Sequence, residues 1–331
     1  MITFLISAIR LGMTLLFGAT GEAITEKSGH LNLGIPGTMC VGAASGCMAE
    51  GIYYNAVDGN LNPILAVLIP ILATFLGSAL MGAIYSFMTV TLRANQNVTG
   101  LVLTTLGIGI ANYMIAAVEA HTYSRATVYF TAKIPVLSEL GWFGQLFFGY
   151  GIMIYLAIAI AILTSFVLNK TRLGLHLRAV GESPATADAA GINVTLYRYG
   201  ATCVGCGIAG LGGLTFVMDY LNGNWEYVID SIGWLSVALV IFMAWRPIFG
   251  ILCSIIFSSF YVASSYIPTL VREVEWLFKT FPYLATLEVK ELFKMLPYLV
   301  TIVVLIVTSI RNRKEDQPPA SLGLNYYREE R

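Results

Sequence analysis

The sequence predicts an all-α polytopic membrane protein. Of its 331 residues, 57% are hydrophobic and only 11% are charged, and the mean hydropathy is +0.74. Soluble domains carry roughly 25% charged residues. Long segments without any charged side chain recur along the chain, and a helix that spans a bilayer needs about 20 mostly apolar residues. A membrane β-barrel would instead show short segments of alternating polarity, which this sequence lacks.

The apolar segments predict between eight and ten transmembrane helices, and nine is the count that we obtain. The nine predicted spans cover residues 3–20, 31–49, 64–91, 98–118, 149–168, 199–218, 231–245, 248–267 and 295–310. Polar connections of varied length separate them. We expect residues 1–314 to form a single transmembrane domain.

Positive charge predicts the orientation of this domain. Lys and Arg cluster in four connections, and nine spans place all four clusters on the same side of the membrane. The clusters are Arg93; Lys170, Arg172 and Arg178; Arg246; and Arg311, Arg313 and Lys314. Since connections rich in Lys and Arg face the cytoplasm, the N-terminus is predicted outside. The polar residues 315–331 are predicted to form a disordered cytoplasmic tail.

The second predicted span is unusual because Gly34, Pro36 and Gly37 lie near its cytoplasmic end. Proline removes a backbone donor, so we expect a discontinuous helix. A break at membrane depth is tolerated inside protein or beside a water-filled path, and in transporters it points to the translocation route. The alternative is a kinked helix with only a packing role. The polar side chains of Asn32 and Thr38 beside the break favour a path.

The fourth predicted span begins with a second polar group of residues. Asn97 and Thr99 stand at its cytoplasmic entrance. Such side chains line a path or, alternatively, hold neighbouring membrane helices together by hydrogen bonds.

A polar stretch at residues 171–191 separates two spans and carries strong helix signals. Ser183 is a good N-cap, and Pro184 suits the first helical position. The alanines that follow favour a helix, which Gly191 can end. A short cytoplasmic helix is therefore predicted at about residues 183–191. Its small side chains suit the cleft of a partner protein, although an ordinary helical surface loop would read the same.

Several classes of function are excluded by what the sequence lacks. It contains no phosphate-binding loop and none of the common hydrolase motifs, so no catalytic residues are predicted. The net charge is zero, which gives no electrostatic support for nucleic-acid binding. His121 stands alone, and we predict no metal site. Arg10 is almost the only ionisable residue within the predicted spans, whereas proton-coupled pumps use carboxylates or histidines there.

Three motifs resemble those of a known family. They are residues 21–43 (GEAITEKSGHLNLGIPGTMCVGA), residues 94–100 (ANQNVTG) and residues 170–193 (KTRLGLHLRAVGESPATADAAGIN). The chain resembles the permease subunit of bacterial ABC importers in the ribose/branched-chain amino-acid permease superfamily, and within it the nucleoside-importer branch. The resemblance covers about residues 10–310. Two departures are Pro36, where relatives often have Glu, and the Ala244–Pro247 segment.

The resemblance implies a set of partners and roles. It implies a multi-pass protein of the bacterial cytoplasmic membrane. It further implies an ATP-binding subunit that carries ATP and Mg, a second permease subunit and an outer substrate-binding lipoprotein, with no cofactor on this chain. The helix at 183–191 would be the coupling helix. The implied ATPase-coupling residues are Gly174, Arg178, Gly181, Glu182, Ser183, Pro184, Ala187, Ala190 and Gly191. The expected path residues are Asn32, Gly34, Gly37, Thr38, Asn97 and Thr99.

The substrate is less closely defined than the role. Nucleosides are the class that the resemblance favours, and riboflavin or a simple sugar are the alternatives. A stand-alone secondary carrier is a further alternative, which would work without an ATPase.

Overall fold

The computed structural model describes residues 2–133, 135, 141–227, 229–273, 295–311 and 317–327. All regular secondary structure in these ranges is helical. The α-helices are α1 (Ile2–Lys27), α2 (Ile35–Ala56), α3 (Leu65–Ser86), α4 (Gln96–Ala116), α5 (Ala120–Ser124), α6 (Thr127–Phe130), α7 (Gly141–Phe148), α8 (Ile152–Lys170), α9 (Arg172–Glu182), α10 (Pro184–Ala189), α11 (Val194–Thr215), α12 (Ile229–Phe242), α13 (Pro247–Glu273) and α16 (Leu296–Arg311). Two π-helical turns, η1 (Phe87–Thr91) and η3 (Phe216–Tyr220), extend α3 and α11. The predicted all-α fold class is confirmed.

Within the described ranges, five helices are long and apolar enough to cross a membrane. They are α1, α3 with η1, α4, α8, and α11 with η3. Two shorter apolar segments, α12 and residues Pro247–Ala263 of α13, accompany them and pack against α1. These lengths establish a polytopic protein, but they do not confirm the predicted count of nine spans.

Helices α1 and α11 form the centre of the bundle. In the apolar stretch of α11 with η3, 89% of the residues are buried, whereas in that of α3 with η1 only 28% are buried. Helix α11 is therefore a core helix, and α3 faces outward. The close approach of α1 and α11 depends on glycine. A Cβ added to Gly21 would lie 2.2 Å from the carbonyl oxygen of Gly205. Small residues permit such close helix packing in membrane proteins.

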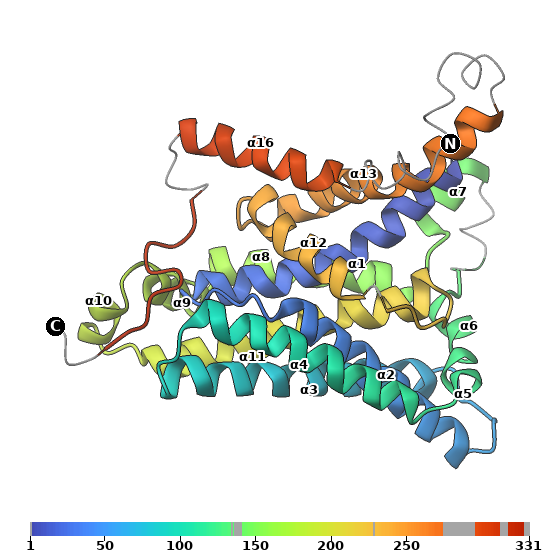
Figure 1. Cartoon of the computed structure of the whole chain (residues 1–331), viewed down its shortest axis with the longest axis horizontal. Coiled ribbons are helices and arrows are strands. Elements are labelled where there is room, and N and C mark those ends of the chain that lie inside the picture. Colours follow the sequence, from blue (N-terminus) through green and yellow to red (C-terminus); the bar gives the residue numbers. More distant parts are fainter. Residues whose placement is uncertain are drawn as a thin grey trace.

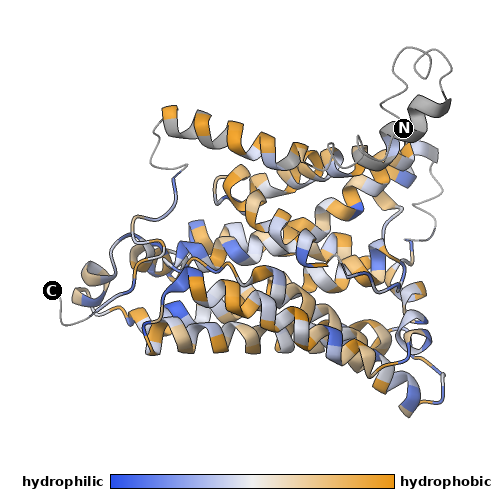
Figure 2. Cartoon of the chain, viewed as in Figure 1, coloured by the Kyte–Doolittle hydropathy of each residue, from blue (hydrophilic) through white to orange (hydrophobic). Residues whose placement is uncertain are grey.

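The two ends of the bundle differ in composition and structure (Figure 1). One end carries α9, α10 and residues 317–327, and the opposite end carries α5, α6 and α7. Hydrophobic residues run along the bundle between them, and hydrophilic residues gather towards the ends (Figure 2). The basic residues Lys27 and Arg93 lie at the first end, where they contact Trp245 and Tyr327. By the positive-inside rule we name this the cytoplasmic end and the other the outer end.

The predicted break lies before the second helix and not within it. Helix α2 is continuous from Ile35, with Gly34 as its N-cap and Pro36 in its first turn. Proline is tolerated there because the first helical N–H groups have no partner inside the helix. The preceding residues 28–34 are non-helical and mostly buried. We call residues 28–34 the buried loop.

Residues 317–327 are ordered against the cytoplasmic end, which differs from the disordered tail that the sequence predicts. The main-chain N–H of Ser321 donates to the carbonyl of Gly181 at 3.0 Å, and that of Gly323 donates to the carbonyl of Gly29 at 3.2 Å. Composition alone suggested disorder. The segment is held by its backbone groups, on which composition carries no information. We call residues 317–327 the C-terminal strap.

Two helices are longer than the predicted spans, and the extra turns bring charged groups into the interior. Helix α1 continues to Lys27, which buries Glu22 and Glu26. Helix α11 continues through η3, which buries Asp219. The expectation that Arg10 is almost alone among ionisable residues in the spans is therefore wrong. A span predicted from hydropathy ends at the first carboxylate, even when the fold provides a partner that stabilises that carboxylate.

Candidate functional site

The predicted cytoplasmic stretch forms two short helices, α9 and α10, and each begins with a capping residue. Thr171 caps α9 by accepting a hydrogen bond from the Gly174 N–H at 3.3 Å. Ser183 then ends α9 and caps α10 by accepting from the Thr186 N–H at 3.4 Å, with Pro184 at the first position. Helix α10 thus lies within the residues 183–191 that were predicted to be helical.

Helix α10 is anchored on one side and open on the other. Ala187 is only 3% exposed and packs in a small cluster with Val180 and Val194. Ala189 and Ala190 are exposed. The helix therefore presents small side chains to the cytoplasm, while Ala187 and the hydrogen bond from Tyr326 to Asp188 hold it to the protein.

Glycines join this region to the bundle. A Cβ on Gly181 would lie 2.3 Å from the carbonyl oxygen of Lys27, at the end of α1. A Cβ on Gly174 would lie 2.2 Å from the carbonyl oxygen of Val167 in α8. Gly191 adopts the left-handed backbone conformation (φ +84°) that favours glycine after a helix. Any side chain at the first two positions would separate α9 from α1 or α8.

The remaining predicted coupling residues lie on the same face of the protein. Glu182 ends α9, and its carboxylate accepts a hydrogen bond from the Ala320 N–H of the C-terminal strap at 3.3 Å. The Nε atom of Arg178 is buried without a hydrogen-bond partner among the described residues. Residues Gly174 to Gly191 therefore lie together at the cytoplasmic end, with Gly174 and Gly181 turned towards the bundle.

Asn32 is the centre of a buried polar network in the buried loop. Its main-chain N–H donates to Oε1 of Glu22 at 3.0 Å, and its side-chain amide donates to Sγ of Cys206 at 3.3 Å. Its side-chain oxygen accepts from the Gly34 N–H at 2.9 Å. Asn32 is fully buried, so in this conformation it supports the loop and does not face an open channel.

The other predicted path residues separate into two groups. Gly37, Thr38 and Thr99 are buried between α2 and its neighbours, and a Cβ on Gly37 would lie 2.5 Å from the carbonyl oxygen of Leu103. Asn97 is exposed on α4. The structure brings Asn32, Gly34, Gly37 and Thr38 together, and it leaves Asn97 apart from them.

Gln96 is a central residue that the predicted site omits. It is 2% exposed, and its side-chain oxygen accepts from the Leu31 N–H at 2.9 Å. Its amide donates to the carbonyl of Leu324 at 3.3 Å. Gln96 therefore joins the buried loop to the C-terminal strap. Its place between two asparagines in a polar motif was the signal that could have identified it.

Arg198 and His30 are two further buried polar residues next to the buried loop and the C-terminal strap. Nη1 of Arg198 donates to the carbonyl of Leu324 at 3.4 Å. Nδ1 of His30 lies 3.2 Å from Oγ1 of Thr202, which itself donates to the Arg198 carbonyl; the imidazole therefore carries its proton on Nδ1. Burial, helped by the Arg198 charge, lowers the pKa of His30 to about 3, so the ring is neutral at physiological pH.

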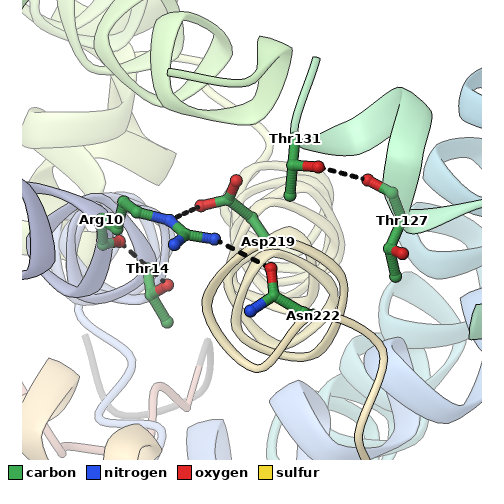
Figure 3. A network of polar contacts seen from close by, with 6 residues as sticks. All are labelled: Arg10, Thr14, Thr127, Thr131, Asp219 and Asn222. Atoms are coloured by element: carbon green, nitrogen blue, oxygen red, sulfur yellow. Dashed lines mark hydrogen bonds and ion pairs between the residues drawn. The ribbon is translucent and has the colours of Figure 1, made fainter. Parts of the chain in front are cut away.

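A second polar network lies at the outer end (Figure 3). Nε of Arg10 donates to Oδ2 of Asp219 at 2.9 Å, and Nη2 of Arg10 donates to Oδ1 of Asn222 at 3.5 Å. Thr131 lies opposite and donates to the carbonyl of Thr127 at 2.8 Å. Arg10, Asp219 and Asn222 border a cavity of about 800 Å³. Asp219 lies one residue beyond the sixth predicted span (199–218), although a lone arginine in the first span already required a partner.

The family comparison agrees with this architecture. Residues 4–305 match the family described as the branched-chain amino acid transport system permease component. The chain belongs to this family of permeases. The permease is thus a transport subunit and not an enzyme, and it is a multi-pass integral protein of the bacterial inner membrane.

Three curated relatives cover most of the permease. The nucleoside ABC transporter permease protein NupC of Lactococcus lactis is 31% identical over 82% of this chain and 86% of its own length. The guanosine ABC transporter permease protein NupQ of Bacillus subtilis is 31% identical over 81% of this chain and 82% of its own. The putative glucose ABC transporter permease protein TsgC13 of Haloferax volcanii is 33% identical over 73% and 70%, respectively.

Proposed function

We propose that this permease forms the translocation path of an ATP-driven importer for nucleosides. The observation that supports this substrate is the 31% identity to two relatives named for nucleosides and guanosine, over more than 80% of the chain in each case. A sugar is the second candidate, because a relative named for glucose is 33% identical. Both kinds of solute are neutral and carry adjacent hydroxyl groups.

The proposed complex contains three further components. An ATP-binding subunit holds ATP and Mg, a second permease subunit completes the path, and an outer lipoprotein delivers the solute. The exposed face of α10, with residues 183–191 around it, is the proposed contact with the ATP-binding subunit. Its small side chains and its single buried anchor at Ala187 support this role, because they allow α10 to enter a cleft without leaving the protein.

The contacts of α9 support a route for the coupling motion. The glycine contact between Gly181 and the end of α1 joins α9 to a central helix. The hydrogen bonds of the C-terminal strap to Gly181 and Gly29 join α9 to the buried loop. A displacement of α10 would then reach α1 and the start of α2 together. Alternation between outer and inner access is the proposed result.

The buried loop, the start of α2 and the start of α4 are the proposed inner part of the path. The proposed path residues remain Asn32, Gly34, Gly37, Thr38, Asn97 and Thr99. Asn97 is already exposed and is the one that can meet solute or the second permease in this conformation. The buried members would reach the path only when the buried loop moves.

Purification of the tagged permease from its native host, in mild detergent, tests this proposal. We expect mass spectrometry to identify an ATP-binding subunit, a second permease and an outer lipoprotein. The complex, reconstituted into liposomes with its lipoprotein, should take up labelled guanosine only when ATP is inside. Competition with uridine, glucose and riboflavin would rank the substrate classes. Recovery of the chain alone, together with ion-driven uptake, would contradict the proposal and favour a secondary carrier.

A further inference from the structure

The outer cavity has the size and the borders of a small-molecule site. Its volume of about 800 Å³ lies within the range of roughly 300–1,000 Å³ that is typical of ligand pockets. Its lining comes from separate parts of the chain, namely α1, the segment after α6 (Thr131 and Lys133), α7, the connection between α7 and α8, and the residues at and just after the end of η3. Lining residues used below are Arg10, Tyr150, Gly151, Asp219 and Asn222.

An ion pair gives this cavity polarity without much net charge. The Asp219 side chain is 2% exposed and that of Arg10 is 25% exposed. A buried carboxylate is tolerated when a positive group pairs with it, and ionisable groups at such depth commonly have a function. These two charges balance, and Lys133, which also lines the cavity, is exposed at its border, so the buried part of the lining carries no net charge. A neutral solute with several hydrogen-bonding groups suits the cavity better.

Tyr150 is a further polar residue of this cavity. It lines the cavity, it is only 4% exposed, and its hydroxyl has no hydrogen-bond partner among the described residues. Burial raises the pKa of Tyr150 to about 12, so the hydroxyl remains protonated. A buried hydroxyl without a partner is costly. A ligand that both accepts and donates hydrogen bonds would remove this cost.

The backbone at Gly151 leaves room beside the Asp219 carboxylate. A Cβ at this position would lie 1.7 Å from the carbonyl oxygen of Phe130 and 3.2 Å from Oδ1 of Asp219. Only glycine therefore fits between these groups. The second carboxylate oxygen is thus kept free of a neighbouring side chain, and it is the one not bonded to Arg10.

We propose that this cavity binds the transported solute at the outer end, through adjacent hydroxyl groups such as those of a ribose or a sugar ring. This inference rests on the proposed function. Asp219 would accept hydrogen bonds from the hydroxyls, and Arg10 and Asn222 would donate to ring or carbonyl oxygens. Tyr150 would bond to one further polar group of the solute.

The test uses the complete complex in liposomes and the variant Tyr150→Phe, which removes only one oxygen atom. The matched control is Tyr155→Phe. The Tyr155 hydroxyl lies on α8 and already donates to the carbonyl of Phe147 at 3.0 Å. We expect Tyr150→Phe to raise the KM for uptake of labelled guanosine about three- to tenfold, because one hydrogen bond to the solute is lost. Tyr155→Phe should leave the KM unchanged.

Solute analogues identify the groups that are bound. Guanosine, 2′,3′-dideoxyguanosine and glucose are compared as competitors of labelled guanosine uptake. The proposal predicts that 2′,3′-dideoxyguanosine, which lacks both hydroxyls, competes more weakly than guanosine in the wild type. In Asp219→Asn, the two analogues should differ less in how strongly they compete. Competition by 2′,3′-dideoxyguanosine as strong as that of guanosine in the wild type would contradict the proposal.

Two results separate the inference from the proposed function. If the wild-type complex imports guanosine and Tyr150→Phe and Asp219→Asn both keep the wild-type KM, the cavity does not bind the solute and the inference is wrong, while the function stands. If the complex imports neither guanosine nor glucose, the proposed function itself fails. Gel filtration of each variant with its partners excludes misfolding as the cause of a changed KM.

Discussion

The cytoplasmic and outer ends of this permease use polar groups in opposite ways. At the cytoplasmic end, the C-terminal strap pairs its main chain with Gly181 and Gly29, and elements distant in sequence become one unit. At the outer end, Arg10 and Asp219 meet at the border of a cavity. Hydrogen bonds that join separate segments into one unit suit the transfer of motion between those segments. Polar groups that remain open suit the binding of a solute.

The largest expected effect comes from breaking α10 at the cytoplasmic end. The Ala187 N–H donates to the carbonyl of Ser183 at 3.0 Å, so Ala187→Pro removes this bond and costs about 3 kcal/mol in a helix interior. We expect loss of ATP-driven uptake, while the membrane-embedded helices keep their circular dichroism. Ala185→Pro is the matched control, because proline is tolerated in the first turn. Normal uptake by Ala187→Pro would refute the coupling role of α10.

The second effect comes from removing the C-terminal strap. A chain that stops after residue 316 loses the hydrogen bonds to Gly181 and Gly29, and it leaves Gln96 and Arg198 without their partner at Leu324. We expect a severalfold fall in uptake and weaker retention of the ATP-binding subunit on purification. A milder variant, Tyr326→Phe, loses only the hydrogen bond to Asp188 and should show a small fraction of this effect. If the shortened chain retains its ATPase and its uptake rate, the strap has no part in coupling.

The outer ion pair offers a third test, this time of stability. Arg10→Met leaves the buried Asp219 carboxylate unpaired and should destabilise the protein by about 3 kcal/mol. The double variant Arg10→Met/Asp219→Leu should recover much of this loss, because both charges are then absent. Thermal unfolding in detergent measures the difference. Equal melting temperatures for the single and double variants would indicate that the two charges are not coupled.

The smallest effect concerns pH at the cytoplasmic end. The folded pKa of His30, about 3, lies below its unfolded value of about 6.5. The unfolded chain therefore binds more protons between these values, and stability is complete above pH 6.5 and falls as the pH falls below it. At pH 5.5 the loss is about 1.4 kcal/mol. His30→Gln should show a smaller drop in melting temperature between pH 7.5 and pH 5.5 than the wild type, and an identical drop would exclude His30 as its source.

Sequence reasoning predicted the parts of this protein that depend on local chemistry. The helical membrane fold follows from apolar length, and α10 follows from Ser183 and Pro184 at a helix start. The break near Pro36 was correctly located to within a few residues but was placed inside the helix. The choice between a kink and a loop depends on whether other groups can pair with the backbone of residues 28–34, and only the fold decides that.

The missed residues share a different physical cause. Gln96, Asp219 and Tyr150 acquire their importance from partners or cavities formed by segments far away in sequence. The C-terminal strap is the clearest case, because its backbone pairs with residues about 140 and 290 positions earlier. Composition describes the solubility of such a segment and carries no information on the carbonyl groups that it will meet.

The position of the C-terminal strap also has a consequence for biosynthesis. Residues 317–327 follow every helix of the described chain, so the ribosome makes them after all of those helices. Until then, Gly29 and Gly181 lack their strap partners and Asp188 lacks Tyr326. A nascent chain therefore displays α10 on an incomplete surface. Only a permease whose described helices have all been synthesised therefore carries the finished surface.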